Sequence, residues 1–151
     1  MSELKKHQYC TFLLDGQRFG VAVENVQEVI RAQHMTPVPL TTPIIRGLIN
    51  LRGQIVIALD PRRRLGFPEG PPGRLPINVV IRRGEGTVSL LVDEVGEVVT
   101  ADPSTFERPP ETIRKEVRDV LEGLYKLNDR LLLILDLERF FNIQTQGARQ
   151  A

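Results

Sequence analysis

The chain has 151 residues, of which 41% are hydrophobic and 26% are charged, and its formal net charge is +1. This length and composition are typical of one globular domain that buries its own core, and the near-zero charge excludes a general electrostatic attraction to nucleic acid or anionic lipid. No apolar run approaches the roughly 18 residues that a membrane span requires, and the N-terminal segment lacks a signal-peptide hydrophobic stretch, so we expect a cytoplasmic protein without direct membrane insertion.

Short strands separated by turns dominate the pattern along the chain. Residues 9–23 contain two apolar stretches on either side of Asp15-Gly16, a dipeptide that favours a tight hairpin turn. Residues 77–92 repeat the arrangement of strand, glycine-rich turn and strand. Turns at such short intervals favour small barrels over a sheet built from alternating strands and helices.

Two further hairpin tips are predicted at residues 50–54 and 126–130, where Gly53 and Asn128 are expected to supply backbone freedom. Each tip is followed by a run of five apolar residues, IVIAL in one case and LLLIL in the other. Such continuous runs predict strands that are buried on both faces.

Three segments have helical signals. In ETIRKEVRDVLEGL the apolar residues fall at helical spacing, and we expect a helix that ends near Arg118 before a strand that begins by Val120. A second short helix is expected over residues 137–143. Residues 61–66 are predicted to form a helical turn, with Asp60 as its cap and proline at its first position.

The sequence also contains an internal repeat. Residues 47–65 match residues 123–141 at a constant offset of 76 (123 minus 47), and residues 21–30 match residues 90–99 at an offset of 69 (90 minus 21). Two matched blocks in the same order indicate a duplicated unit with one longer loop in the second copy. The identical pairs of the longer block are Gly47/Gly123, Leu48/Leu124, Leu51/Leu127, Leu59/Leu135, Asp60/Asp136 and Arg63/Arg139.

The repeat predicts a single domain over residues 8–143 that is built from two small barrels, with tails at residues 1–7 and 144–151. We expect the first barrel to come mainly from residues 15–66 and the second mainly from residues 77–136, with the terminal segments crossing over. Halves of about 70 residues are marginal as independent units, so the two barrels should support each other.

The residue types that catalysis requires are sparse. His7 and His34 do not lie at metal-ligand spacing from each other or from Cys10, and one cysteine builds neither a zinc site nor an internal disulfide. No glycine-rich loop opens a helix in the manner of a phosphate site. We therefore predict a protein that is not an enzyme and has no cofactor or metal.

One basic cluster makes nucleic-acid binding an alternative function, because small five-stranded barrels can bind oligonucleotides. The cluster is Arg62, Arg63 and Arg64. Barrels of that kind usually stack bases on exposed aromatic side chains, but aromatic residues are only 5% of this chain and tryptophan is absent. The favoured interpretation is a solvated face of a short helical turn, with nucleic-acid binding as the alternative.

Arg52 differs between the two copies, where its counterpart is Asn128. Duplication makes structural positions agree, so a position at which the copies disagree is a candidate for a function acquired by one half. Glu28 is the nearest candidate counter-charge in the same half. An arginine held by such a carboxylate offers a planar group with several donors to a protein partner.

The run GLINLRGQIVIALDPRRRLG, preceded by FGVAVENVQEVI and PVPLTTPIIR, resembles the CheW family of bacterial chemotaxis coupling proteins over about residues 8–143. The resemblance implies an all-β fold of two intertwined five-stranded SH3-like β-barrels with short helical turns. It also implies a scaffold without enzymatic activity, placed at membrane-associated receptor arrays. Such proteins bridge the cytoplasmic tips of methyl-accepting chemoreceptors to the regulatory domain of the histidine kinase CheA.

The same resemblance assigns the partner-binding residues. It implies that Arg52 is the coupling arginine and that Glu28, within VQEVI, is its acidic neighbour. Val26 and Gly47 match positions that bind partners in the family. The remaining residues expected at the site belong to the turn that presents the arginine: Asn50, Leu51 and Gly53.

Overall fold

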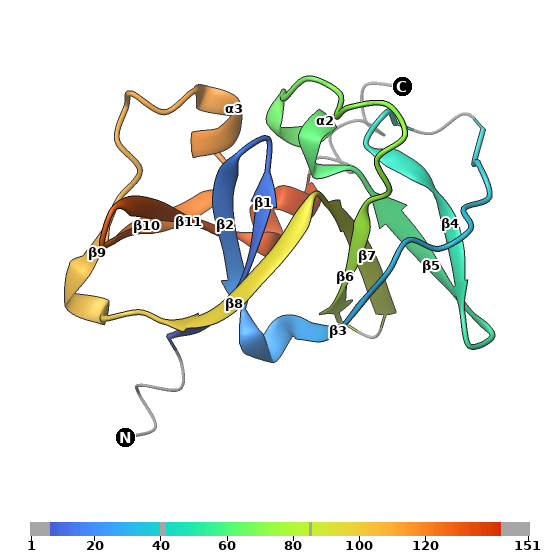
Figure 1. The fold of residues 1–151 in the computed structure, drawn as a ribbon, viewed down its shortest axis with the longest axis horizontal. Coiled ribbons are helices and arrows are strands. Elements are labelled where there is room, and N and C mark those ends of the chain that lie inside the picture. Colours follow the sequence, from blue (N-terminus) through green and yellow to red (C-terminus); the bar gives the residue numbers. More distant parts are fainter. Residues whose placement is uncertain (1–6, 40–41, 85, 143–151) are drawn as a thin grey trace.

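The computed structural model describes residues 7–39, 42–84 and 86–142. They form two antiparallel-rich sheets, each of which curls into a small barrel, and the two barrels lie side by side along the long axis of the molecule (Figure 1). The predicted all-β, double-barrel fold is confirmed.

The first barrel is a five-stranded sheet in the order β3-β6-β7-β5-β4. Its strands are β3 (Val26–Ile30), β4 (Ile45–Leu51), β5 (Gln54–Leu59), β6 (Ile77–Arg83) and β7 (Gly86–Val92). The second barrel is a six-stranded sheet in the order β8-β1-β2-β11-β10-β9. Its strands are β1 (Gln8–Leu14), β2 (Gln17–Ala22), β8 (Glu94–Thr100), β9 (Phe106–Glu107), β10 (Leu121–Leu127) and β11 (Arg130–Leu135).

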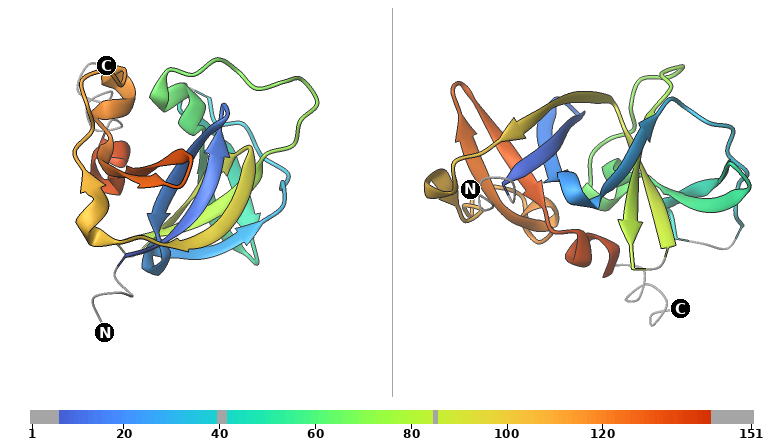
Figure 2. Two further views of the ribbon diagram at one scale, coloured as in Figure 1. Left: turned by 60° about the vertical axis from the view of Figure 1, so that its left-hand side comes forward. Right: turned by 90° about the horizontal axis from the view of Figure 1, so that it is seen from below.

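Each half of the sequence gives its first hairpin to the other barrel. Hairpin β1–β2 joins the second barrel through the parallel pairing of β2 with β11, and hairpin β6–β7 joins the first barrel through the parallel pairing of β7 with β5. Figure 2 shows β1 and β2 beside β10 and β11 from two further sides. The predicted division into residues 15–66 and residues 77–136 is wrong for β2 and for hairpin β6–β7, because turn signals are local and do not encode which distant strand a hairpin joins.

The duplication is visible in the backbone. The two exchanged hairpins begin 69 residues apart (77 minus 8). Strands β4 and β10 each contain a register shift next to the matched glycine, between Ile45 and Gly47 in one half and between Leu121 and Gly123 in the other. The strand that follows each hairpin tip ends one residue before the matched aspartate, whose amide donates to a carbonyl oxygen of its own half at 2.7 or 2.8 Å.

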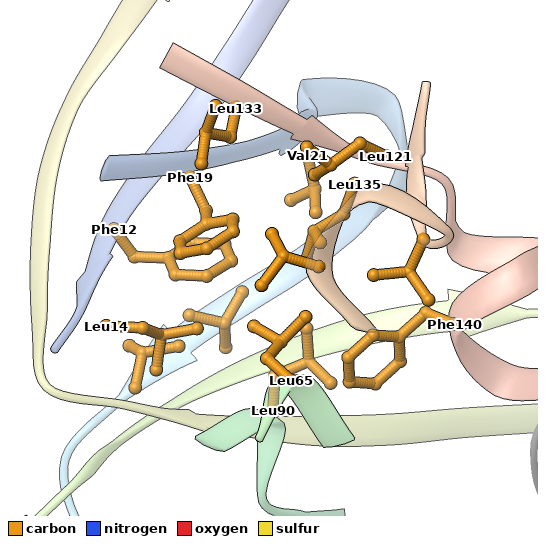
Figure 3. Close-up of a cluster of buried hydrophobic side chains, with 14 of the residues drawn as sticks. Phe12, Leu14, Phe19, Val21, Leu65, Leu90, Leu121, Leu133, Leu135 and Phe140 are labelled. Atoms are coloured by element: carbon orange, nitrogen blue, oxygen red, sulfur yellow. The ribbon is translucent and has the colours of Figure 1, made fainter. Parts of the chain in front are cut away.

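Three clusters of buried side chains hold the fold together. The largest lies between the barrels and receives aromatic and aliphatic groups from both, including Phe12, Phe19, Leu90, Leu135 and Phe140 (Figure 3). Each barrel also has a smaller interior cluster. Because the largest cluster is shared, neither barrel retains its full apolar burial without the other.

The two barrel interiors are duplicated as well. Three buried positions correspond at the offset of 76: Ile49 with Tyr125, Val56 with Leu132, and Ala58 with Ile134. The second interior is the more aromatic, since the hydroxyl groups of Tyr9 and Tyr125 lie 3.2 Å apart within it. Burial is the main reason that the pKa of the Tyr9 hydroxyl is raised, and its hydrogen bond to Tyr125 adds to the effect.

The predicted hairpin tips are present, with one correction. Asp15 and Gly16 both have positive φ, 52° and 79°, as the primed turns of two-residue hairpins require. Arg52 and Gly53 do the same at 51° and 87°. Asn128 does not adopt a positive φ, so the expected backbone freedom is not used at that tip.

The helical segments follow the sequence signals with small shifts at their ends. Helix α2 (Pro61–Leu65) is capped by Asp60, whose side chain accepts a hydrogen bond from the Arg62 amide, as predicted. Helix α3 (Lys115–Arg118) is shorter than its apolar spacing suggested, but it ends at the predicted residue, and β10 begins one residue after Val120. Residues 137–142 are helical, and residue 143 lies outside the described residues. Two short 3-10 turns complete the description, η1 (Val23–Asn25) and η2 (Pro103–Thr105).

Candidate functional site

The β4–β5 turn is fixed by contacts within its own four residues. The Asn50 side-chain oxygen accepts a hydrogen bond of 2.8 Å from the Gly53 amide. This bond closes the turn while Arg52 occupies the left-handed region of backbone space. A left-handed conformation disfavours any side chain larger than hydrogen, and polar residues that close local turns offset part of that cost. The turn therefore presents Arg52 at the rim of the first barrel in one defined backbone geometry.

The Arg52 guanidinium forms an ion pair with the Glu28 carboxylate. The arginine side chain is 69% exposed and the glutamate side chain only 22% exposed. The hydrogen bond from Arg52 lowers the pKa of Glu28, and a second bond of 3.3 Å from the Gln27 side chain lowers it further. In return, the bond to Glu28 raises the pKa of Arg52. The less exposed Glu28 carboxylate therefore anchors the pair, and the Arg52 guanidinium keeps donor groups available to solvent.

This ion pair spans the seam of the first barrel. Strands β3 and β4 are the two ends of the five-stranded sheet. Farther along the seam, Thr36 and Leu48 exchange two backbone hydrogen bonds of 2.8 Å. A hollow beside the turn is lined by Gln33, His34, Thr36, Leu48, Ile49, Asn50 and Ile55. The Ile55 side chain is 61% exposed, so an apolar surface lies next to the exposed arginine.

The left-handed backbone conformation of Arg52 predicts how its replacement affects stability. Replacing Arg52 with glycine is expected to leave the free energy of unfolding unchanged or to raise it by up to about 1 kcal/mol, because glycine adopts the left-handed conformation without steric cost. Urea unfolding of the two proteins measures this difference. A loss of more than about 1 kcal/mol would show instead that the ion pair is needed to hold the barrel together.

The other predicted site residues have different surroundings. Leu51 is buried in the interior of the first barrel. Val26 is half-buried against the cluster between the barrels. Gly47 is buried against the backbone of Thr36, and a Cβ atom at Gly47 would lie 2.7 Å from the Thr36 carbonyl oxygen. The structure thus brings Glu28 to the Arg52 turn but leaves Gly47 and Val26 in supporting positions.

Comparison with known proteins identifies the family of this double barrel. The family model described as CheW-like domain matches residues 8–145. The chain belongs to the CheW-like family. The Chemotaxis protein CheW of Bacillus subtilis is 33% identical over 125 residues, which cover 83% of this chain and 80% of that protein. The Chemotaxis protein CheW of Thermotoga maritima is 28% identical over 136 residues, covering 90% of this chain and 88% of the relative.

A solved structure agrees with the CheW-like assignment. The crystal structure of the scaffolding protein TtCheW from Thermoanaerobacter tengcongensis superimposes with a TM-score of 0.76 at 28% identity. The match covers 86% of this chain and 88% of that one. This double-barrel fold is therefore shared with a protein that is described as a scaffolding protein.

The basic cluster of this CheW-like protein is used internally. Arg62 is buried and donates to the Asp93 carboxylate at 2.6 and 3.2 Å and to the Pro68 carbonyl oxygen at 2.6 Å. Arg63 contacts the carboxylates of Asp60 and Glu69. The expectation of a solvated face is therefore wrong for Arg62.

Arg64 is also engaged within the protein. Its guanidinium donates to the carbonyl oxygens of Phe140 and Arg139 at 3.2 and 3.3 Å. Burial lowers the pKa of Arg64. The three arginines thus tie α2 to neighbouring segments, and no observation favours the nucleic-acid alternative.

Two residues near the site were missed from the sequence. Gln27 supports Glu28 directly, and Thr36 closes the seam against Leu48. Gln27 lies within the VQEVI motif and could have been found there, whereas Thr36 has no sequence signal because its role depends on a contact across the barrel. Within residues 7–39, 42–84 and 86–142, no group of three His, Cys, Asp or Glu side chains is placed to hold a metal ion, and no helix there is long and apolar enough to cross a bilayer.

Proposed function

We propose that this CheW-like protein is a scaffold without enzymatic activity that couples chemoreceptors to the histidine kinase CheA in a chemotaxis-type signalling pathway. Membership of the family supports this function, as does the likeness to a protein described as a scaffold. We place its action at receptor arrays next to the membrane, through partner contacts rather than insertion.

The exposed arginine of the β4–β5 turn is the single observation that carries the proposal. A strained residue on a surface turn adds nothing to packing, and such strain is retained where it has a function. Glu28 holds the base of the guanidinium, and the remaining donor groups of Arg52 point to solvent with the exposed Ile55 nearby. An arginine next to an apolar side chain is typical of residues that dominate protein interfaces.

Replacing Arg52 with glutamate tests the proposed function. The variant places a second carboxylate beside Glu28, so the ion pair becomes a repulsion and the donor group is lost. We expect at least about tenfold weaker binding in co-sedimentation with receptor-containing membranes and CheA, together with loss of receptor control over kinase activity.

Two comparisons make this experiment specific. Arg82→Glu makes the same charge change at an exposed position on β6 of the same barrel and should retain binding. Circular dichroism should show that both variants stay folded, because Arg52 and Arg82 are exposed. Wild-type behaviour of Arg52→Glu in both binding and kinase control would refute the role of Arg52.

A further inference from the structure

The seam of the second barrel lacks the ion pair that spans the seam of the first. By the offset of 69, Glu97 corresponds to Glu28, and by the offset of 76, Asn128 corresponds to Arg52. No ion pair of Glu97 occurs among the described residues. The second seam instead contains a polar hollow bounded by β8, β10 and the β10–β11 turn.

Arg18 lies in the wall of this hollow and lacks a carboxylate partner in the described part of the chain. Its side-chain Nη1 makes one long contact, 3.4 Å to the Thr11 hydroxyl oxygen. Its Nε is buried and has no hydrogen-bond partner. The guanidinium thus has one long contact and no carboxylate partner, so a carboxylate that reached its terminal nitrogens would form the charge-assisted bonds that the protein does not make.

Because Gly96 has no side chain, the Arg18 guanidinium can lie against its backbone. A Cβ atom at Gly96 would lie 2.6 Å from Nη1 of Arg18 and 2.6 Å from the Thr11 hydroxyl oxygen. In the first barrel the corresponding positions are Gln27 and Thr87, so the arginine and its glycine are both particular to the second barrel. A difference between duplicated positions at two contacting residues marks a feature of one barrel alone.

Most of the other charged groups that line the hollow already have partners within the protein. Asp129 pairs with Arg130 at 3.3 Å, and Lys126 pairs with Glu107 at 3.1 Å. Asp102 accepts from the backbone and side chain of the η2 turn at 3.0 and 2.8 Å. Glu97 offers its backbone carbonyl oxygen to Thr11, and its side chain is exposed without an ion pair among the described residues. Among the cations that line the hollow, Arg18 alone has no carboxylate partner in the described part of the chain.

Strand β8 supplies backbone groups beside the same hollow. It pairs with β1 along one edge only, and its other edge is the end of the six-stranded sheet. The Val98 side chain on this strand is 56% exposed. Unpaired strand edges accept an added strand from a partner chain, and side-chain pockets beside the edge then determine which sequence binds.

We propose that the open seam of the second barrel is a second protein-docking site, at which an extended partner segment pairs with β8 and places an acidic side chain on Arg18. The partner is defined by its chemistry, a short strand-forming segment with a glutamate or aspartate directed into the hollow. This site lies on the opposite barrel from Arg52, so one copy of the protein can hold two partners at once.

Nuclear magnetic resonance of the full-length ¹⁵N-labelled protein tests the proposal with two blocked tripeptides, valine-glutamate-valine and valine-glutamine-valine. We expect the glutamate peptide to shift the Nε–Hε signal of Arg18 and the amide signals of β8 with a Kd on the order of 10 mM. The glutamine peptide should bind at least about tenfold more weakly.

Matched variants assign the effect to Arg18. Arg18→Met should abolish the preference for glutamate, whereas Arg130→Met, on the rim of the same hollow, should retain it. If Arg18→Met fails to fold, Gly96→Ala displaces the guanidinium without removing it, and Gly86→Ala is its control because the nearest atom to a Cβ there is 3.9 Å away.

Equal binding of the two peptides, or the absence of a saturable shift at Arg18, would overturn the proposal. Shifts confined to the Arg52 turn would do the same. These results are independent of the Arg52→Glu experiment, since neither peptide requires receptor or kinase to be present.

Discussion

Replacing Arg62 with methionine is expected to lower the free energy of unfolding by about 3 kcal/mol. Arg62 joins α2 to the start of β8 through Asp93, and its Nη1 also lies 3.4 Å from the Asp15 carboxylate in the β1–β2 turn. Both members of the closest pair are nearly buried, at 10% and 15% exposure. Methionine fills much of the space but leaves the Asp93 carboxylate desolvated without its counter-charge. Urea unfolding measures the loss.

The effect of this substitution should depend on pH. Burial raises the pKa of Asp93, but hydrogen bonds from Arg62 and from the Asp15 amide outweigh it, so the net pKa lies below its ordinary value. The native pair therefore stabilises the fold above the ordinary aspartate pKa of about 4 and loses this contribution as the pH falls below it.

In the methionine variant the burial effect remains without the arginine, so protonation of Asp93 relieves the unpaired charge. The difference in unfolding free energy between the two proteins should shrink as the pH is lowered from 7 towards 4. Arg130→Met is the control, because its pairing with Asp129 is exposed on both sides, and it should cost less than about 1 kcal/mol. A loss below about 1 kcal/mol for Arg62→Met would contradict the role given to this network.

Replacing Gly123 with alanine is expected to cost about 2–3 kcal/mol, because the added methyl group has no space. A Cβ atom there would lie 2.3 Å from the Phe106 ring and 2.5 Å from the Glu107 carbonyl oxygen. The ring can turn, but the carbonyl belongs to the backbone of β9, so β9 must separate from β10. Thermal unfolding should show the loss, and near-ultraviolet circular dichroism should change because Phe106 packs edge-on against Tyr125.

Gly86→Ala is the matched control for this substitution, since it adds the same methyl group to a strand where space is open, and it should change stability by less than about 0.5 kcal/mol. Equal stability of the two alanine variants would show that β9 is not held against Gly123. The duplicated Gly47 is under a similar constraint from Thr36. We therefore expect a larger residue at Gly47 to act on partner binding through the segment that closes the first seam.

Local features of the fold were readable from the sequence. The dipeptide Asp15-Gly16 and the proline after Asp60 each determine a conformation through their own backbone chemistry, so a hairpin and a capped helical turn could be placed. The repeat could be placed as well, because buried positions keep their spacing after duplication. The exchange of hairpins could not, since pairing β2 with β11 rather than β5 depends on packing between segments far apart in the chain.

Part of the candidate site could also be predicted from the sequence. Arg52 was found because the two copies disagree there, and its pairing with Glu28 was an inference from charge that the structure bears out. Arg62 was misjudged because a run of arginines looks alike whether it faces solvent or a buried aspartate. Arg18 could not be predicted from the sequence, since the lack of a carboxylate around an arginine is visible only in the folded structure.

The exchange of hairpins also has a consequence for how the protein is made. During translation β1 and β2 leave the ribosome well before β11, since the pairing of Phe19 with Leu133 joins residues 114 positions apart (133 minus 19). An isolated hairpin is marginally stable, and strand pairing over such separations is slow. The nascent chain must therefore carry an unpaired edge of β2 until β11 has been synthesised. A product truncated before β11 lacks the strand that pairs with β2.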